Sequence, residues 1–406
     1  MSSGLLSEHF EGIAFKSLSA VEAHPERSNQ HEFDGVQQLR LMLGAEKATF
    51  PAQFVYLTDD DDEVRSATGF VTWYDARERH PTRSEYRLYF PTTAVSERAS
   101  EGDLAVIARR RDGTVLVAIA DEGTTAENQL RWLFNLPEVG GQFQTQEVVK
   151  EDRTLGFAAT QLLEQLGVET EPRTPQVDLE ALISRFGGVF PDTATFSEFA
   201  RTTLKGVRST DDPDAAVMAW LEREEAMFRA LERQIVSKRL SAGFGSHGQD
   251  VDAFVQFSLQ VHNRRKSRAG YSVENHLEQV FRDYRVHYSR NKRTEGKSTP
   301  DFIFPGIDAY HDPTFDRAAL SMLGVKTTCK DRWRQILDEA DQIPGKHLFT
   351  LETGISEDQT EAMRARLVQL VIPASLHETF TSKQQPQLLR LRDFIDLISR
   401  RKDHRG

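Results

Sequence analysis

The chain has 406 residues, 38% hydrophobic and 28% charged, which is typical of a soluble globular protein and excludes collagen-like, disordered and membrane classes. At about 150 residues per domain, this length predicts two or three domains. No run approaches the roughly 18 uninterrupted apolar residues of a membrane span, and the first residues do not form a secretory signal. One cysteine, Cys329, excludes a disulfide framework or thiolate zinc cluster, so we expect a cytoplasmic protein with no membrane partner.

The net charge of -11 conceals two basic segments. Ten Lys or Arg stand against four Asp or Glu between residues 262 and 297, and nine Arg stand against six acids between residues 64 and 111. Because steering of a charged ligand depends on the local field, two DNA-facing surfaces are compatible with an acidic chain. The alternative interpretation is two solvated faces.

The first part of the chain predicts a small β-barrel with a few short helices, one of them at residues 127–134. Its strand-like runs are residues 54–57, 68–74, 86–90, 104–108 and 115–120. The Asp112-Gly113 pair predicts a hairpin turn between the last two strands. Residues 171–177 contain two prolines and no apolar period, which predicts a linker between domains at 1–170 and 178–406.

After the linker, the apolar period indicates helices alternating with strands. The predicted helices are residues 214–240, 251–262, 273–284, 331–342 and 386–400, and the predicted strands are 302–304, 323–328, 347–351 and 367–372. This alternation indicates an α/β domain with a mixed sheet. The G-x-G-x-x-G pattern at 243–248 follows a basic helix end rather than a strand, so we do not interpret it as a dinucleotide loop.

Two acids and a lysine in this second part suit phosphodiester hydrolysis. Asp301 opens one predicted strand, and Lys326 lies inside the next, where a lysine is costly unless it meets a carboxylate, a metal-bound water or a phosphate. Glu339 lies on the stripe of the following predicted helix that turns back towards this pair. Magnesium prefers such oxygen ligands and keeps several waters, one of which can attack a phosphate. Glu274 is a candidate further carboxylate, and the spacing alone is not specific.

Several runs resemble the catalytic domain of the EcoRII-type restriction endonucleases, over roughly the second half of the chain. They are NRRKSRAG (263–270), ENHLE (274–278), TPDFIFP (299–305), AYHD (309–312), VKTTCKDRWRQILDEAD (325–341) and HLFTLE (347–352). The resemblance implies a PD-(D/E)xK nuclease fold in which the second acid lies on a helix thirteen residues after the lysine, as Glu339 follows Lys326. It further implies that Asp301 and Glu339 bind Mg²⁺, that Lys326 assists the attacking water and that Glu274 is an additional active-site acid.

The same resemblance places Tyr310 near the scissile phosphate, although a packed aromatic with a bonded hydroxyl is the alternative. Lys330, Asp331 and Arg332 match the family's base-reading triplet. Lys and Arg donate to guanine, and a carboxylate accepts from cytosine N4. The implied site is a short CC…GG sequence of the CCWGG or CCNGG type, and several family members flip its central bases. A capped, solvated helix start is the alternative for the triplet.

A second basic group is expected to contact DNA phosphates or to shape a dimer interface, with a plain solvated cluster as the alternative. Its members are Arg264, Arg265, Lys266 and Arg268.

The amino-terminal half is similar, more loosely, to the family's effector-binding domain, a DNA-binding pseudobarrel shared with plant auxin-response transcription factors. The candidate effector-contacting residues are His31, Arg83, Glu85 and Arg87. Alternation along a strand would place the last three on one face, where they can read base edges and bind phosphates. An exposed salt-bridged strand is the alternative. Pro81 and Tyr86 stand where the family has basic residues.

These observations predict a type IIE-like restriction endonuclease that cleaves double-stranded DNA with Mg²⁺. A palindromic site predicts a homodimer. By resemblance, the amino-terminal domain binds a second copy of the site as an allosteric effector and covers the catalytic cleft when DNA is absent, and a companion cytosine methyltransferase is expected. The alternatives are a non-catalytic DNA-binding regulator and a structure-specific repair nuclease on the same fold. The intact Asp301, Lys326 and Glu339 argue against the first, and the base-reading triplet argues against the second.

Overall fold

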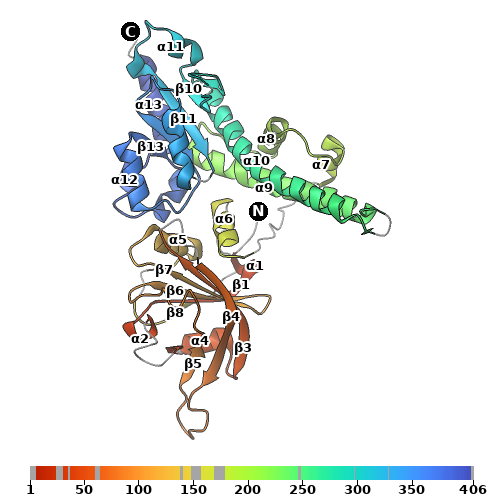
Figure 1. Cartoon of the computed structure of the whole chain (residues 1–406), viewed down its shortest axis with the longest axis vertical. Coiled ribbons are helices and arrows are strands. Elements are labelled where there is room, and N and C mark those ends of the chain that lie inside the picture. Colours follow the sequence, from red (N-terminus) through yellow and green to blue (C-terminus); the bar gives the residue numbers. More distant parts are fainter. Residues whose placement is uncertain are drawn as a thin grey trace.

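The computed structural model describes residues 6–23, 31–34, 37–59, 65–137, 140–147, 157–168, 179–245, 248–296, 298–327 and 329–403. The predicted linker, 171–177, lies outside the described residues. Two sheets, one from each half of the chain, are separated in Figure 1 by a layer of helices. Within the described ranges, no helix has the length and apolar character needed to cross a membrane.

The amino-terminal sheet has eight strands in the order β2-β5-β4-β3-β7-β6-β1-β8 and curls strongly in Figure 1. The strands are β1 (Phe10–Ser17), β2 (Glu32–Asp34), β3 (Ala48–Leu57), β4 (Arg65–Asp75), β5 (Tyr86–Tyr89), β6 (Leu104–Arg110), β7 (Val115–Ala120) and β8 (Gln144–Glu147). All neighbours are antiparallel except β3 and β7. The five predicted strands are present, and β6 and β7 meet at the predicted turn, where Gly113 has a φ of 86°. The predictions missed β1, β2 and β8.

Both faces of this sheet are buried because apolar residues occupy successive positions of the central strands. In β3, Phe54 and Tyr56 point into a core enclosed by the curled sheet. Val55 and Leu57 point to the other face, into a larger core that continues into the carboxyl-terminal half. Side chains alternate along a strand, so this uninterrupted apolar run is typical of a strand covered on both sides.

The amino-terminal half has five helices among its described residues: α1 (Leu6–His9), α2 (Ala20–Ala23), α4 (Gln37–Leu43), α5 (Thr125–Phe134) and α6 (Phe157–Gln165). Helix α5, predicted at 127–134, begins at Thr124, whose hydroxyl accepts a hydrogen bond from the amide of Glu127. It packs against the carboxyl-terminal half, where the amide nitrogen of Gln129 donates to the backbone oxygen and to Oγ1 of Thr353. The two halves therefore share one continuous core.

Four helices follow: α7 (Leu179–Phe186), α8 (Thr193–Thr202), α9 (Pro213–Ala242) and α10 (Val251–Asp283). The last two lie side by side as a long hairpin (Figure 1). Helix α10 is continuous where two helices were predicted. Its polar middle stays helical because Arg265 and Arg268 form ion pairs with Glu232 and Glu224 of α9.

The carboxyl-terminal sheet is mixed, as predicted, in the order β13-β12-β11-β10-β9. Its strands are β9 (Ser289–Arg290), β10 (Phe302–Phe304), β11 (Ser321–Lys326), β12 (Lys346–Thr350) and β13 (Val368–Val371). β11, β12 and β13 are parallel, and β9, β10 and β11 are antiparallel. The helical segments around it are α11 (Ile307–His311), η2 (Arg317–Ala319), η3 (Lys330–Asp338), α12 (Glu357–Ala365), η4 (Ala374–Thr379), η5 (Gln385–Gln387) and α13 (Leu391–Asp403).

The α-helix predicted at 331–342 is wrong: η3 is a 3-10 helix that ends at Asp338, and Glu339 is extended. The buried residues of this segment, Trp333 and Ile336, are three apart, which matches three residues per turn. η3 packs closely on β11, since a Cβ at Gly324 would lie 2.8 Å from Cγ2 of Ile336. Glu339 therefore leaves the helical segment and approaches the sheet from an extended connection.

Candidate active site

Asp301 and Lys326 meet at the edge shared by β10 and β11. Asp301 directly precedes β10, and the antiparallel register pairs Phe302 with Leu323. The Oδ2 atom of Asp301 accepts a hydrogen bond from the amide of Val325 at 2.6 Å and lies 3.5 Å from Nζ of Lys326. The sheet itself thus fixes the carboxylate beside the lysine, and both side chains stay partly open to solvent.

Glu339 faces the same pair from the end of η3. Its Oε2 atom is buried and has no hydrogen-bond partner among the described residues. Burial, followed by the charge of Asp301, raises the pKa of Glu339 to about 7, against the opposing effect of Lys326 and Lys346. An acceptor oxygen without a partner, beside a second carboxylate, is what a cation site requires before the cation binds.

Glu274 approaches from α10 but is already paired. Arg290 of β9 donates to its Oε2 atom at 3.0 Å, and Asn291 donates to the same oxygen at 3.3 Å. Burial, with the charge of Asp301, nevertheless raises the pKa of Glu274. The structure thus brings Glu274 near Asp301, and Arg290 compensates its charge. Arg290 was missed by the sequence analysis, because it is one of ten cations in the basic segment 262–297.

Tyr310 is a packed aromatic residue with a hydrogen-bonded hydroxyl, which was the alternative to a position near the scissile phosphate. It is 1% exposed, its hydroxyl donates to Glu295, and the same oxygen accepts from the amide of Gln342 at 3.2 Å. Burial and the bond to Glu295 raise its pKa. The hydroxyl is therefore hydrogen-bonded within the protein, as the alternative interpretation predicts.

The donor set fits Mg²⁺. No group of three or more His, Cys, Asp or Glu within the described ranges is arranged to hold a metal ion by itself. Mg²⁺ is usually bound through one or two carboxylates and completes its shell with waters and substrate phosphates. Asp301 and Glu339, with the unpaired Oε2 of Glu339, meet that requirement.

The predicted base-reading triplet lies at the start of η3. The side chains of Lys330 and Asp331 are outside the described part of the structure, whereas the side chain of Arg332 is exposed. The turn before them is anchored, because the backbone amide of Cys329 donates to the carboxylate of Glu352. Cys329 is buried, and burial raises the pKa of its thiol.

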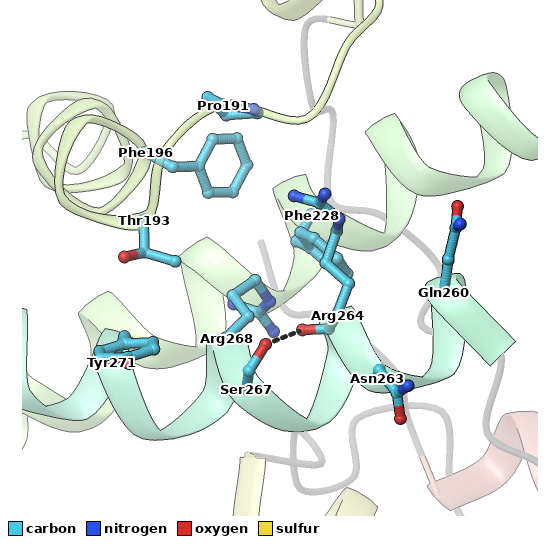
Figure 2. A pocket seen from close by; sticks show the side chains of 10 residues that line it. All are labelled: Pro191, Thr193, Phe196, Phe228, Gln260, Asn263, Arg264, Ser267, Arg268 and Tyr271. Carbon is cyan, nitrogen blue, oxygen red and sulfur yellow. Dashed lines mark hydrogen bonds between the residues drawn. The ribbon is translucent and has the colours of Figure 1, made fainter.

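The predicted phosphate-binding cluster borders a cavity of about 550 Å³ between α8, α9 and α10 (Figure 2). Arg264 is exposed and stacks over the ring of Phe190 at 4.6 Å. Arg268 is 6% exposed and pairs with Glu224 and Glu225, and its burial argues against the predicted phosphate contact.

Of the remaining two members of this cluster, Arg265 pairs with Glu232 at 2.8 Å, and the side chain of Lys266 is not described. Arg264 is therefore the member whose guanidinium has no carboxylate partner among the described residues.

The predicted effector-binding residues do not share one strand. β5 begins at Tyr86, so Arg83 and Glu85 precede the strand that holds Arg87, although the Glu85 and Arg87 side chains are in contact. Arg87 pairs with Glu32 at 2.7 Å and with Glu85 at 2.6 Å, as the salt-bridged alternative predicts. Arg83 is exposed.

His31, the fourth candidate, packs edge-on against Phe90. Its Nδ1 atom is buried without a hydrogen-bond partner among the described residues. His31 is half-buried, and its ring packs at the end of β5.

The half of the chain that carries these carboxylates is similar to known proteins. Residues 228–395 match the model of the EcoRII C terminal family. The chain is 42% identical over 207 residues to the type II restriction enzyme EcoRII of Escherichia coli. The match covers 51% of this chain and 50% of EcoRII, so the chain spans about half the length of this relative. Over that half, the chain is homologous to a type II restriction enzyme.

Two solved structures are similar at lower identity. Metal-depleted Ecl18kI in complex with uncleaved DNA is 18% identical, with a TM-score of 0.45, over 56% of this chain and 85% of Ecl18kI. The complex of restriction endonuclease PspGI with substrate DNA is 16% identical, with a TM-score of 0.42, over 53% of this chain and 94% of PspGI.

Proposed function

We propose that the protein is an EcoRII-type, Mg²⁺-dependent restriction endonuclease that hydrolyses phosphodiester bonds of double-stranded DNA. The observation that carries the proposal is the meeting of Asp301, Lys326 and Glu339 at one sheet edge, inside the region homologous to EcoRII. The sequence match to EcoRII covers only half of each chain. The proximity of two carboxylates and a lysine supports the proposal independently of that match.

Asp301 and Glu339 would hold the metal, which supplies a Lewis acid for the phosphoryl oxygens and a water of lowered pKa. Asp301 is kept in place by the amide of Val325. Lys326 places a positive charge beside this carboxylate, where it can stabilise the developing charge on the phosphate and orient the attacking water. Glu274, paired with Arg290, lies near Asp301 and helps to hold the site in shape.

Sequence reading is assigned to the start of η3. Lys330, Asp331 and Arg332 supply the donors and the acceptor that a G·C pair presents in the major groove. The proposed site is therefore a CC…GG sequence of the CCWGG or CCNGG type. Arg264, exposed over Phe190, is the best placed member of its cluster for a phosphate contact.

The remaining parts of the proposal concern assembly and regulation. Residues 1–170 would form a DNA-binding pseudobarrel that takes a second copy of the site as allosteric effector, and residues 178–406 would form the catalytic and dimerising domain. A homodimer suits a palindromic site, and self-protection calls for a companion cytosine methyltransferase. The contact of α5 with the carboxyl-terminal half gives the first domain a physical means of influencing the second.

The test is digestion of a plasmid rich in CC…GG sites with Mg²⁺ or EDTA, followed by sequencing of the fragment ends. We expect discrete fragments only with Mg²⁺, with ends at one repeated short sequence. Asp301→Asn should abolish cleavage and keep DNA binding. Asp308→Asn is the matched control, because Asp308 is an exposed acid on α11.

Each rival function has its own outcome in this experiment. Intact plasmid that still binds the protein, even with short site-bearing duplexes added, would show a non-catalytic regulator. Ends without a common sequence would show a structure-specific nuclease.

A further inference from the structure

Residues 339–342, which we term the Glu339 loop, are held at both ends by side chains outside the proposed catalytic set. Lys346 donates through Nζ to the backbone oxygens of Glu339 and Ala340, the second at 2.9 Å. The carboxylate of Glu295 accepts a hydrogen bond from the backbone amide of Asp341 at 3.3 Å. The backbone of the loop is thus hydrogen-bonded to side chains at successive residues.

Lys346 is an unusual residue to find inside the fold. It begins β12, which lies between β13 and β11 in the carboxyl-terminal sheet, and is 5% exposed. Burying an ammonium is costly unless hydrogen bonds compensate. Its ammonium donates hydrogen bonds to the two loop carbonyls, and burial lowers its pKa.

The loop needs such support because its backbone is strained. Ala340 has a φ of 50°, in the left-handed region that residues with a Cβ seldom adopt. Glu339 directly before it is extended, so the direction of its side chain depends on how this turn is fixed. Lys346 binds the carbonyls of the two peptide bonds that flank Ala340 and so holds the turn in place.

Tyr310 supports the far end of the loop. Its hydroxyl accepts a hydrogen bond from the backbone amide of Gln342 at 3.2 Å and donates one to the carboxylate of Glu295. That carboxylate in turn accepts a hydrogen bond from the backbone amide of Asp341. The side chains of Lys346, Tyr310 and Glu295 together form what we term the loop clamp.

We propose that Lys346 is a positioning residue for metal binding, and that Tyr310 acts with it through the Glu339 loop rather than on the phosphate. The inference rests on the proposed function, since it gives Glu339 the role of metal ligand. Without the clamp, the loop can relax towards an unstrained turn and the Glu339 carboxylate loses its fixed direction towards Asp301.

The first test measures Mg²⁺ binding to the full-length protein without DNA, by calorimetry and by the Mg²⁺-dependent rise in unfolding temperature. Lys346→Met should weaken Mg²⁺ binding about 10- to 100-fold, the usual effect of removing a residue that orients a metal ligand. Lys16→Met is the matched control. Lys16 is equally buried, at 5% exposure, and is paired with Glu22 on the amino-terminal sheet. The Lys16→Met variant should be less stable than the wild type and keep wild-type Mg²⁺ affinity.

A second variant keeps the test informative if Lys346→Met does not fold. Tyr310→Phe removes one hydroxyl and keeps the ring. We expect the Mg²⁺ concentration for half-maximal cleavage to rise, with little change in the rate at saturating Mg²⁺. A hydroxyl acting on the phosphate would instead lower the saturating rate and leave the Mg²⁺ requirement unchanged, which would overturn the proposal for Tyr310.

The two proposals fail differently. If the wild-type protein binds no Mg²⁺, or if Glu339→Gln leaves Mg²⁺ affinity unchanged, the proposed function is wrong. If Glu339→Gln weakens binding and a folded Lys346→Met does not, Lys346 is only structural. In the Glu339→Gln background, Lys346→Met should have no further effect on Mg²⁺ affinity, because its effect passes through Glu339.

Discussion

Glu339→Gln should stabilise the metal-free protein at neutral and alkaline pH. The substitution keeps the shape of the side chain and removes a charge that the fold holds at a cost, since burial and Asp301 raise the pKa of Glu339 from 4.5 to about 7. Between these two values, the folded state keeps a proton that the unfolded state has released. The free energy of unfolding therefore declines as pH rises through this window.

The size of the effect follows from the raised pKa. At about 1.4 kcal/mol for each tenfold change in proton affinity, the charged carboxylate costs the folded state about 3 kcal/mol above pH 7. Partial exposure of the side chain reduces this to about 2 to 3 kcal/mol. We expect Glu339→Gln to gain this amount at pH 8 and almost nothing near pH 4.5.

Urea unfolding of both chains in EDTA, at several pH values between 4.5 and 8, measures the difference directly. His347, whose pKa is lowered by burial to about 4, titrates in the same range but is common to both chains and cancels. Glu361→Gln, at an exposed position of α12, is the control and should show no pH-dependent gain. A gain that is absent at pH 8, or equal at every pH, would refute the reasoning. Mg²⁺ should reverse the order by stabilising the wild type more than the variant.

Two further predictions concern the basic residues. Arg332→Ala should weaken binding to the recognition sequence by about 1 to 3 kcal/mol with little effect on unrelated DNA, as gel shifts at fixed salt would show, whereas a loss equal on both DNAs would assign Arg332 to the backbone. The neighbouring Arg334→Ala is its control. Arg268→Met should lower the free energy of unfolding by about 3 to 5 kcal/mol because it removes the arginine partner of the fully buried Glu224 and leaves His276 beside it, while Arg264→Met costs less than about 1 kcal/mol. Equal unfolding midpoints for these two variants would contradict the burial argument.

Several strand predictions rested on uninterrupted apolar runs. Residues 54–57 and 115–120 lie in β3 and β7, whose successive apolar side chains fill a core on each face of the sheet. β2 and β8 were missed because they are edge strands of three and four residues, and such short runs carry little pattern. The single α10 was divided at its charged middle, because the ion pairs that keep it helical come from α9, more than thirty residues earlier in the chain.

In the candidate active site, the sequence predicted the charged residues more readily than the side chains that hydrogen-bond to them. The pairing of Asp301 with Lys326 followed from two adjacent strands, and the structure has it. The partners of Glu274 and Tyr310 were not predicted, because Arg290 lies in a strand of two residues and Glu295 in a connection, and neither segment has an apolar period. Lys346 was missed for the same reason, since a lysine before an apolar strand looks like any strand end until the loop it binds is placed.

Glu339 shows why the error in η3 matters for function. On an α-helix, its direction would be set by helical geometry and by the residues one turn away. In the structure it lies in an extended segment followed by a left-handed alanine, so its direction depends on tertiary contacts, principally those of Lys346. A carboxylate held in this way, close to another carboxylate and with an Oε2 atom that no described residue hydrogen-bonds, destabilises the empty fold. A bound cation removes that cost, so the same contacts that strain the metal-free protein increase its affinity for the metal.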